Sequence, residues 1–78
     1  KTKMVREAIN SLPEKQRSAL ILREYEGMDY QEIANILDQT VSSVKSLLFR
    51  ARASVKAQLE SYFNEPAMMR EYEEMKLR

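Results

Sequence analysis

The 78-residue sequence contains no cysteine and no histidine. Without cysteine, the chain can form neither disulfide bonds nor thiolate zinc sites. Without histidine, it lacks the commonest general base and the commonest metal ligand of proteins. No pair of carboxylates occurs in an apolar setting, and the adjacent Glu73 and Glu74 stand in a charged stretch. The sequence therefore predicts a protein that is not an enzyme, with no catalytic residues, no metal site and no cofactor.

Turn-forming residues and long apolar runs are also scarce. One glycine and two prolines leave little turn chemistry for strands, and the composition is dominated by good helix formers such as Leu, Ala, Glu and Lys. No apolar run approaches the about 20 residues of a membrane span, and no signal-peptide pattern is present. We expect one small all-α domain with a modest core, no membrane and no small-molecule substrate. Because the chain begins with Lys1, we expect a piece of a longer protein.

The charged residues that are present are unevenly distributed. The formal net charge is +1, but residues 41–59 hold four basic and no acidic residues, whereas residues 29–40 carry a charge of −3. A basic face on an amphipathic helix is most often simply solvated, but this asymmetry of charge is also what a segment that meets an anionic partner requires.

Apolar spacing and turn residues predict four helices and a short fifth. Their expected ranges are about 2–11, 14–26, 29–37, 41–62 and a piece of 64–78. Ser11 with Glu14, and Asp29 with Glu32, have the spacing of capping boxes. Gly27 is expected to end the second helix. We divide the chain into a domain over residues 1–63 and a helical tail over residues 64–78.

A short helix, a tight turn at residues 38–40 and a longer basic helix form a helix-turn-helix pattern. Thr40 is a good N-cap for the basic helix. A buried stripe is predicted at Val44, Leu48, Ala51, Val55 and Leu59.

The opposite side of this helix is suited to the major groove of DNA, which admits one α-helix. Small side chains, Ser42 and Ser43, open the helix. The outward-facing residues are Lys45, Ser46, Phe49, Arg50, Arg52 and Lys56. We assign Arg52 and Lys56 to phosphates. Phe49 has two readings, shielding the core edge or contacting a thymine methyl or the sugar backbone.

Residues 11–59 resemble region 4 of bacterial sigma-70 family factors, in particular the extracytoplasmic-function (ECF) group. The matching residues are Leu12-Pro13, Arg17, Arg23-Glu24, Gly27, Tyr30, Glu32-Ile33-Ala34, Val44-Lys45-Ser46, Leu48 and Arg50-Ala51-Arg52. The chain departs from the family pattern at Ser42-Ser43, where Gly-Thr is common, and at Leu47, where an arginine is common. The second departure removes one phosphate-binding cation.

The resemblance implies a cytoplasmic transcription factor domain that reads the −35 element of double-stranded promoter DNA. It also implies docking on the β flap of core RNA polymerase, and an anti-sigma factor as a partner. By position, Lys45, Ser46, Phe49 and Arg50 would face the bases, and Arg23 would contact the DNA from the side. We read Arg17 first as a surface or ion-pair residue.

Two alternatives remain beside this interpretation. The effector domain of a response regulator also uses four helices with a helix-turn-helix, although Leu12-Pro13 and Arg50-Ala51-Arg52 favour a sigma factor. A protein-interaction module is the other, because Met68, Met69 and Tyr72 are adaptable interface residues. A tail of this kind more often folds back on its own domain.

Overall fold

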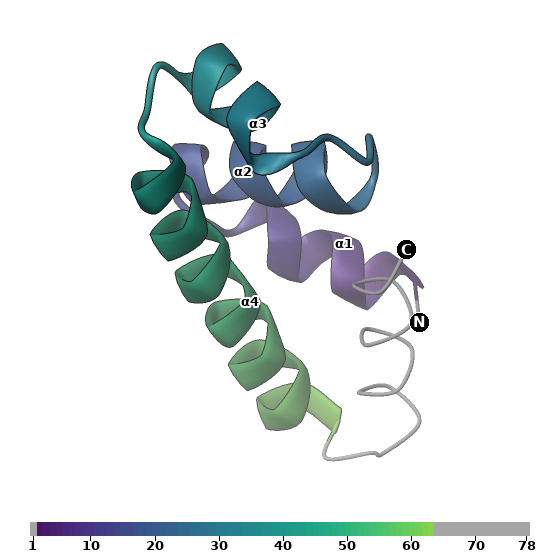
Figure 1. The fold of residues 1–78 in the computed structure, drawn as a ribbon. Coiled ribbons are helices and arrows are strands. Elements are labelled where there is room, and N and C mark those ends of the chain that lie inside the picture. The colour runs from purple at the N-terminus through teal and green to yellow at the C-terminus, as the bar shows by residue number, and fades with distance from the viewer. Residues whose placement is uncertain (1, 64–78) are drawn as a thin grey trace.

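The computed structural model describes residues 2–63, which form four α-helices and no strand (Figure 1). The helices are α1 (Thr2–Asn10), α2 (Glu14–Glu24), α3 (Tyr30–Leu37) and α4 (Val41–Phe63). Within this range the predicted all-α class is confirmed. The predicted fifth helix and the tail at 64–78 lie outside the described residues.

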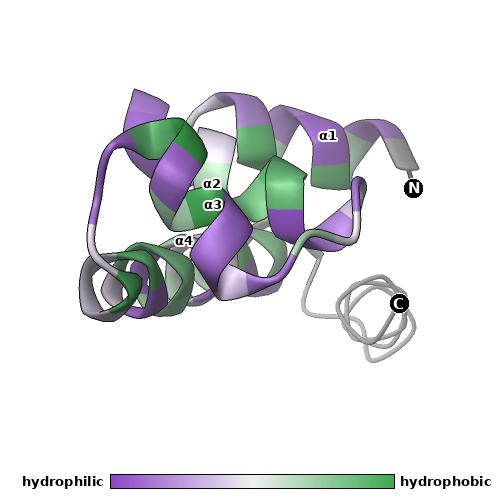
Figure 2. Ribbon diagram, turned by 45° about the horizontal axis from the view of Figure 1, so that its top comes forward, coloured by the Kyte–Doolittle hydropathy of each residue, from purple (hydrophilic) through white to green (hydrophobic). Residues whose placement is uncertain are grey.

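The longest helix, α4, organises the packing. It contacts α1, α2 and α3, and α2 and α3 also pack against each other (Figure 1). Each helix carries both hydrophilic and hydrophobic segments (Figure 2), as expected of amphipathic helices around a shared core. The buried apolar side chains of α1, α2, α3 and the connection between α1 and α2 are Val5, Ala8, Ile9, Leu12, Ala19, Leu20, Ile33 and Ala34.

The predicted stripe on α4 is confirmed at all five positions. Val44, Ala51 and Val55 have no exposed surface, and Leu48 and Leu59 retain 1%. Their spacing keeps them on one side of a helix with about 3.6 residues per turn. The opposite side of α4 is therefore left for solvent or a partner.

The capping box at the start of α3 is also confirmed. The Asp29 side chain accepts a hydrogen bond from the Glu32 backbone N–H at 2.8 Å, and the Glu32 side chain accepts one from the Asp29 N–H at 2.9 Å. These bonds satisfy N–H groups that have no partner inside the helix. Because α3 has only eight residues, this cap and its packing hold a helix that would be marginal alone.

The turn between α3 and α4 has the predicted position. Asp38 adopts the left-handed conformation, with φ 56° and ψ 49°, and ends α3. Thr40 then acts as the predicted N-cap, because its Oγ1 accepts a hydrogen bond from the Ser43 N–H at 3.0 Å. This tight turn fixes the angle at which α4 leaves α3.

The prediction of a capping box at Ser11 and Glu14 is wrong. Pro13 is the N-cap of α2 and no side chain caps the helix there. Ser11 belongs instead to the end of α1, because its N–H donates to the carbonyl of Glu7 at 3.1 Å and its hydroxyl donates to that of Ala8 at 2.8 Å.

Arg17 and Gly27, which the sequence analysis singled out, lie where hydrogen bonds to main-chain carbonyls close the ends of α1 and α2. Arg17, read as a surface or ion-pair residue, donates from Nη1 to the carbonyls of Asn10 and Leu12 at 3.4 and 3.3 Å, and so closes the end of α1. Gly27 lies beyond the end of α2, with φ 69°. The Met28 N–H donates to the Leu22 carbonyl at 3.1 Å across this left-handed residue.

We predict that Leu48→Ala lowers the free energy of unfolding by about 3 kcal/mol, because it leaves a cavity in the centre of the core. Leu47→Ala makes the same chemical change at the half-buried neighbouring position, and should lower it by about 1 kcal/mol. Urea unfolding followed by circular dichroism measures both losses. Equal losses would contradict the burial of the α4 stripe.

Candidate nucleic-acid interface

The side of α4 that faces away from the core carries the predicted contact residues. Lys45, Ser46, Phe49 and Arg50 are all exposed, and Phe49 has 75% of its surface accessible. Neither Lys45 nor Arg50 forms an ion pair with any residue whose side chain is described. An exposed aromatic ring and two cations therefore share the part of α4 that the core leaves uncovered.

Tyr30, the first residue of α3, joins two of the predicted cations. The Arg23 guanidinium carbon lies 4.9 Å from the centre of the Tyr30 ring, and Lys45 Nζ lies 5.8 Å from it. Arg23 Nη1 also donates to the Met28 carbonyl at 2.8 Å. The cation–π contacts therefore bring side chains from α2, α3 and α4 together at the N-terminal part of α4.

Sequence reasoning did not single out Tyr30 as a site residue. The loop before α3 separates Arg23 from Tyr30, and α3 with the turn before α4 separates Tyr30 from Lys45. Only the packing of α2 and α3 on α4 brings them within reach of one another. The signal in the sequence was an aromatic residue at the start of the short helix, between two segments that each carry a cation.

Arg52 lies in a different setting from the other cations. Its Nε and Nη2 donate to Glu24 Oε1 at 3.1 and 2.9 Å. The Glu24 side chain is 2% exposed and that of Arg52 is 27% exposed. Among residues with described side chains this is the only ion pair, and it joins the end of α2 to the middle of α4.

The two serines at the start of α4 differ from each other. Ser42 is exposed, whereas Ser43 is half-buried and donates from its hydroxyl to Gln39 Oε1 at 2.7 Å. Ser43 thus helps to close the turn as well as opening the helix. Lys56, nearer the C-terminal end of α4, is exposed and unpaired within the described part of the chain.

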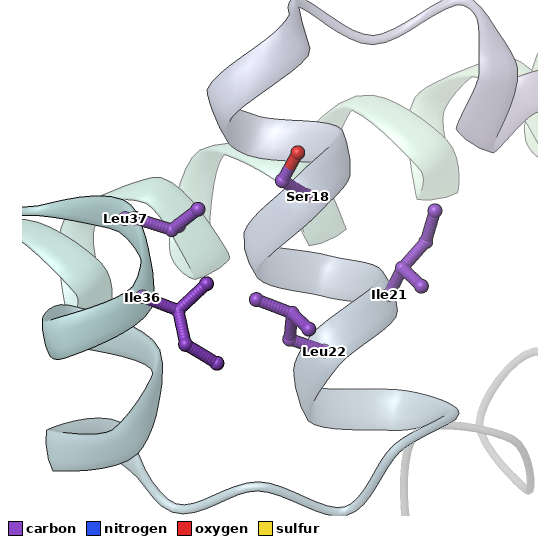
Figure 3. Close-up of a pocket in the computed structure, with 5 residues that line it drawn as sticks. All are labelled: Ser18, Ile21, Leu22, Ile36 and Leu37. Atoms are coloured by element: carbon purple, nitrogen blue, oxygen red, sulfur yellow. The ribbon is translucent and has the colours of Figure 1, made fainter.

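A separate apolar pocket lies between α2 and α3 (Figure 3). It has a volume of about 270 Å³ and is lined by Ser18, Ile21, Leu22, Ile36 and Leu37. Leu22 and Ile36 project into the space between the two helices (Figure 3), and Ile36 is 57% exposed. No titratable side chain lines the pocket, which suits a protein contact better than chemistry.

Two kinds of site are absent from the part of the chain that the structure describes. No cluster of three or more acidic residues there could hold a metal ion. None of the four helices is long and apolar enough to cross a membrane.

The fold and this surface together define a helix-turn-helix domain. Its second helix, α4, presents a basic outer face and has no acidic residue from 41 to 59. The family model for sigma-70, region 4, matches residues 2–55 of the chain. The chain therefore belongs to the sigma-70 region 4 family, and the resemblance seen in the motifs is confirmed. This match does not favour a response-regulator effector domain.

Sigma factors of several bacteria are similar to this chain. The RNA polymerase sigma-H factor of Pseudomonas aeruginosa is 41% identical over 61 residues, which cover 78% of this chain and 32% of that protein. The ECF RNA polymerase sigma-E factor of Haemophilus influenzae is 40% identical over 58 residues, covering 74% of this chain and 31% of that protein. The ECF RNA polymerase sigma-E factor of Escherichia coli is 51% identical over 47 residues, covering 60% and 25%. The chain thus spans about a quarter to a third of these relatives.

We predict that Tyr30→Leu lowers the free energy of unfolding by about 1 kcal/mol more than Tyr30→Phe does. Phenylalanine keeps the ring face that attracts Arg23 and Lys45, whereas leucine removes it. Urea titrations of the two variants at low ionic strength measure the difference. If leucine and phenylalanine were equally stable, the cation–π contacts would contribute nothing to the junction of α2, α3 and α4.

Proposed function

We propose that this domain reads the −35 element of promoter DNA by placing the outer face of α4 in the major groove. The observation that carries the proposal is the division of α4 into two sides. One side is a fully buried stripe, and the other presents Lys45, Ser46, Phe49 and Arg50 to solvent. Membership of the sigma-70 region 4 family supports the same function.

Each exposed residue of this surface has a chemical role in the proposal. Arg50 donates to base edges, where a guanidinium can form two hydrogen bonds with guanine. Lys45 and Ser46 lie one turn nearer the N-terminus of α4 and contact bases or adjacent phosphates. Phe49 meets a thymine methyl group or the sugar backbone, since a ring exposed to 75% cannot act mainly as a core cover.

The remaining predicted residues surround this centre. Ser42 and Ser43 are small, so that the start of α4 can approach the DNA closely. Arg23 approaches from α2, and Lys56 contacts a phosphate further along the groove. Arg52 differs from these cations because it forms an ion pair with Glu24.

Selection of bound sequences from a random duplex library with the 78-residue chain tests the proposal. A converged motif gives the matched site, and enrichment without any motif would refute promoter reading. On the matched site, Arg50→Ala is expected to weaken binding by about 1–3 kcal/mol, while binding to scrambled DNA changes less.

Arg6→Ala is the control for Arg50→Ala. It removes the same charge from an exposed position on α1, whose end packs near Gln58 rather than near the start of α4. It should leave the ratio of matched to scrambled affinity unchanged. If Arg50→Ala also left that ratio unchanged, Arg50 would not contact a base.

We further propose that the domain docks on the β flap of core RNA polymerase in the cytoplasm and is bound by an anti-sigma factor. The similar proteins are RNA polymerase sigma factors, which supports the polymerase as a partner. The apolar pocket between α2 and α3 offers a protein surface that does not overlap the outer face of α4.

We predict that Ile36→Asp weakens binding to the isolated β flap by about tenfold or more, because it places a charge in an apolar contact. DNA affinity should stay within about twofold, apart from a small effect of the added negative charge. Calorimetric titration with the flap measures the first quantity. Ile36→Val, which keeps the apolar surface, is the matched control. Unchanged flap binding by Ile36→Asp would show that the docking surface does not include the pocket between α2 and α3.

A further inference from the structure

We propose that Glu24 and Arg52 are positioning residues for DNA reading, and that Arg52 does not contact phosphate. Their ion pair fixes α4 relative to α2, and so fixes the DNA-reading side chains relative to one another. The inference rests on the proposed function, since it concerns how the same surface achieves its specificity.

The place of the pair in the fold is the first argument. Glu24 is the last residue of α2 and directly follows Arg23, which bonds the Met28 carbonyl and stacks on Tyr30. Arg52 lies about two turns beyond Lys45 on the same side of α4. The pair therefore joins the two helices beside the cations that each of them presents.

The burial of the carboxylate is the second argument. The Glu24 side chain is 2% exposed, and Glu24 is the buried charged residue among those described. One of its carboxylate oxygens accepts hydrogen bonds from both Nε and Nη2 of Arg52. If Arg52 turned towards a phosphate, it would leave a buried carboxylate without its cation. Removing one partner of a buried pair is strongly unfavourable. Lys56 can reach a phosphate without abandoning any described partner.

The consequence concerns specificity rather than overall affinity. Base contacts depend on the placement of side chains, whereas phosphate attraction tolerates small displacements. A loosened α2–α4 contact would therefore weaken binding to the matched site more than binding to scrambled DNA. A lost phosphate contact would weaken both alike and lower the salt dependence of binding by about one unit of slope.

A double-mutant cycle separates these two roles. The variants are Glu24→Gln, Arg52→Gln and both together, with Lys56→Gln as the control. Binding to the selected site and to scrambled DNA is measured over a range of salt concentrations. We expect each single variant to lower the ratio of matched to scrambled DNA affinity by about threefold or more. The double variant should lower this ratio no further than the more severe of the two single variants does. The salt slope of Arg52→Gln should equal that of the wild type, whereas Lys56→Gln lowers the slope and keeps the ratio.

Opposite results would overturn the inference. If Arg52→Gln lowered the salt slope by about one unit with an unchanged ratio, Arg52 would be a phosphate contact. If Glu24→Gln left the ratio intact, the pair would have no positioning role. Partial unfolding cannot imitate the expected result, because it reduces both affinities equally.

Arg52→Lys covers the case in which Arg52→Gln does not fold. Lysine keeps the charge but cannot reproduce the two-donor contact with Glu24. We expect the ratio to fall in this variant, and a wild-type ratio would contradict the positioning role. If the wild type bound DNA without any sequence preference, both the proposed function and this inference would be refuted. If Arg50→Ala lowered the ratio of matched to scrambled affinity but the Glu24 and Arg52 variants did not, this inference alone would be refuted.

Discussion

The burial of one side of α4 is the constraint on which the rest of the structure depends. Five side chains of this helix, spaced over 16 residues, have at most 1% of their surface exposed. The helix contacts α1, α2 and α3, so α4 can neither rotate about its axis nor slide without opening the core. That restriction turns the opposite side into a surface of fixed geometry. A small domain with a modest core can hold DNA-facing side chains in place because the other three helices pack against the helix that carries them.

The end of α2 adds a second fixed point. Arg23 and Glu24 are neighbours in sequence, but their side chains contact different partners where α2, α3 and α4 meet. Arg23 contacts the loop carbonyl of Met28 and the ring of Tyr30, and Glu24 holds Arg52 on α4. A cation at the surface and an anion beneath it thus tie α2, α3 and α4 together at one place. The basic surface of α4 is compatible with a buried glutamate because the charge of Glu24 is neutralised inside the domain.

Local patterns in the sequence account for much of the fold. The spacing of Val44 to Leu59 predicted the buried stripe, and Asp29 with Glu32 predicted the capping box of α3, because both depend on residues within one helix. The same spacing at Ser11 and Glu14 wrongly predicted a capping box for α2, because the pattern does not show that Ser11 completes the last turn of α1. Contacts between helices were beyond such reasoning. The Glu24–Arg52 pair spans 28 residues, and the Tyr30 cluster depends on how three helices pack. The motifs nonetheless indicated the family before any geometry was known. The DNA-facing roles of individual side chains remain predictions.

The absence of cysteine allows a direct measurement of where DNA lies. A single cysteine introduced by Ser46→Cys stands on the outer face of α4, and one introduced by Lys15→Cys stands at an exposed position of α2 as a reference. The rate of thiol alkylation is compared with and without the selected duplex. If α4 enters the major groove, the duplex slows alkylation at position 46 severalfold and leaves position 15 unaffected. Equal alkylation at position 46 with and without bound duplex would show that the outer face of α4 is not the DNA-reading surface.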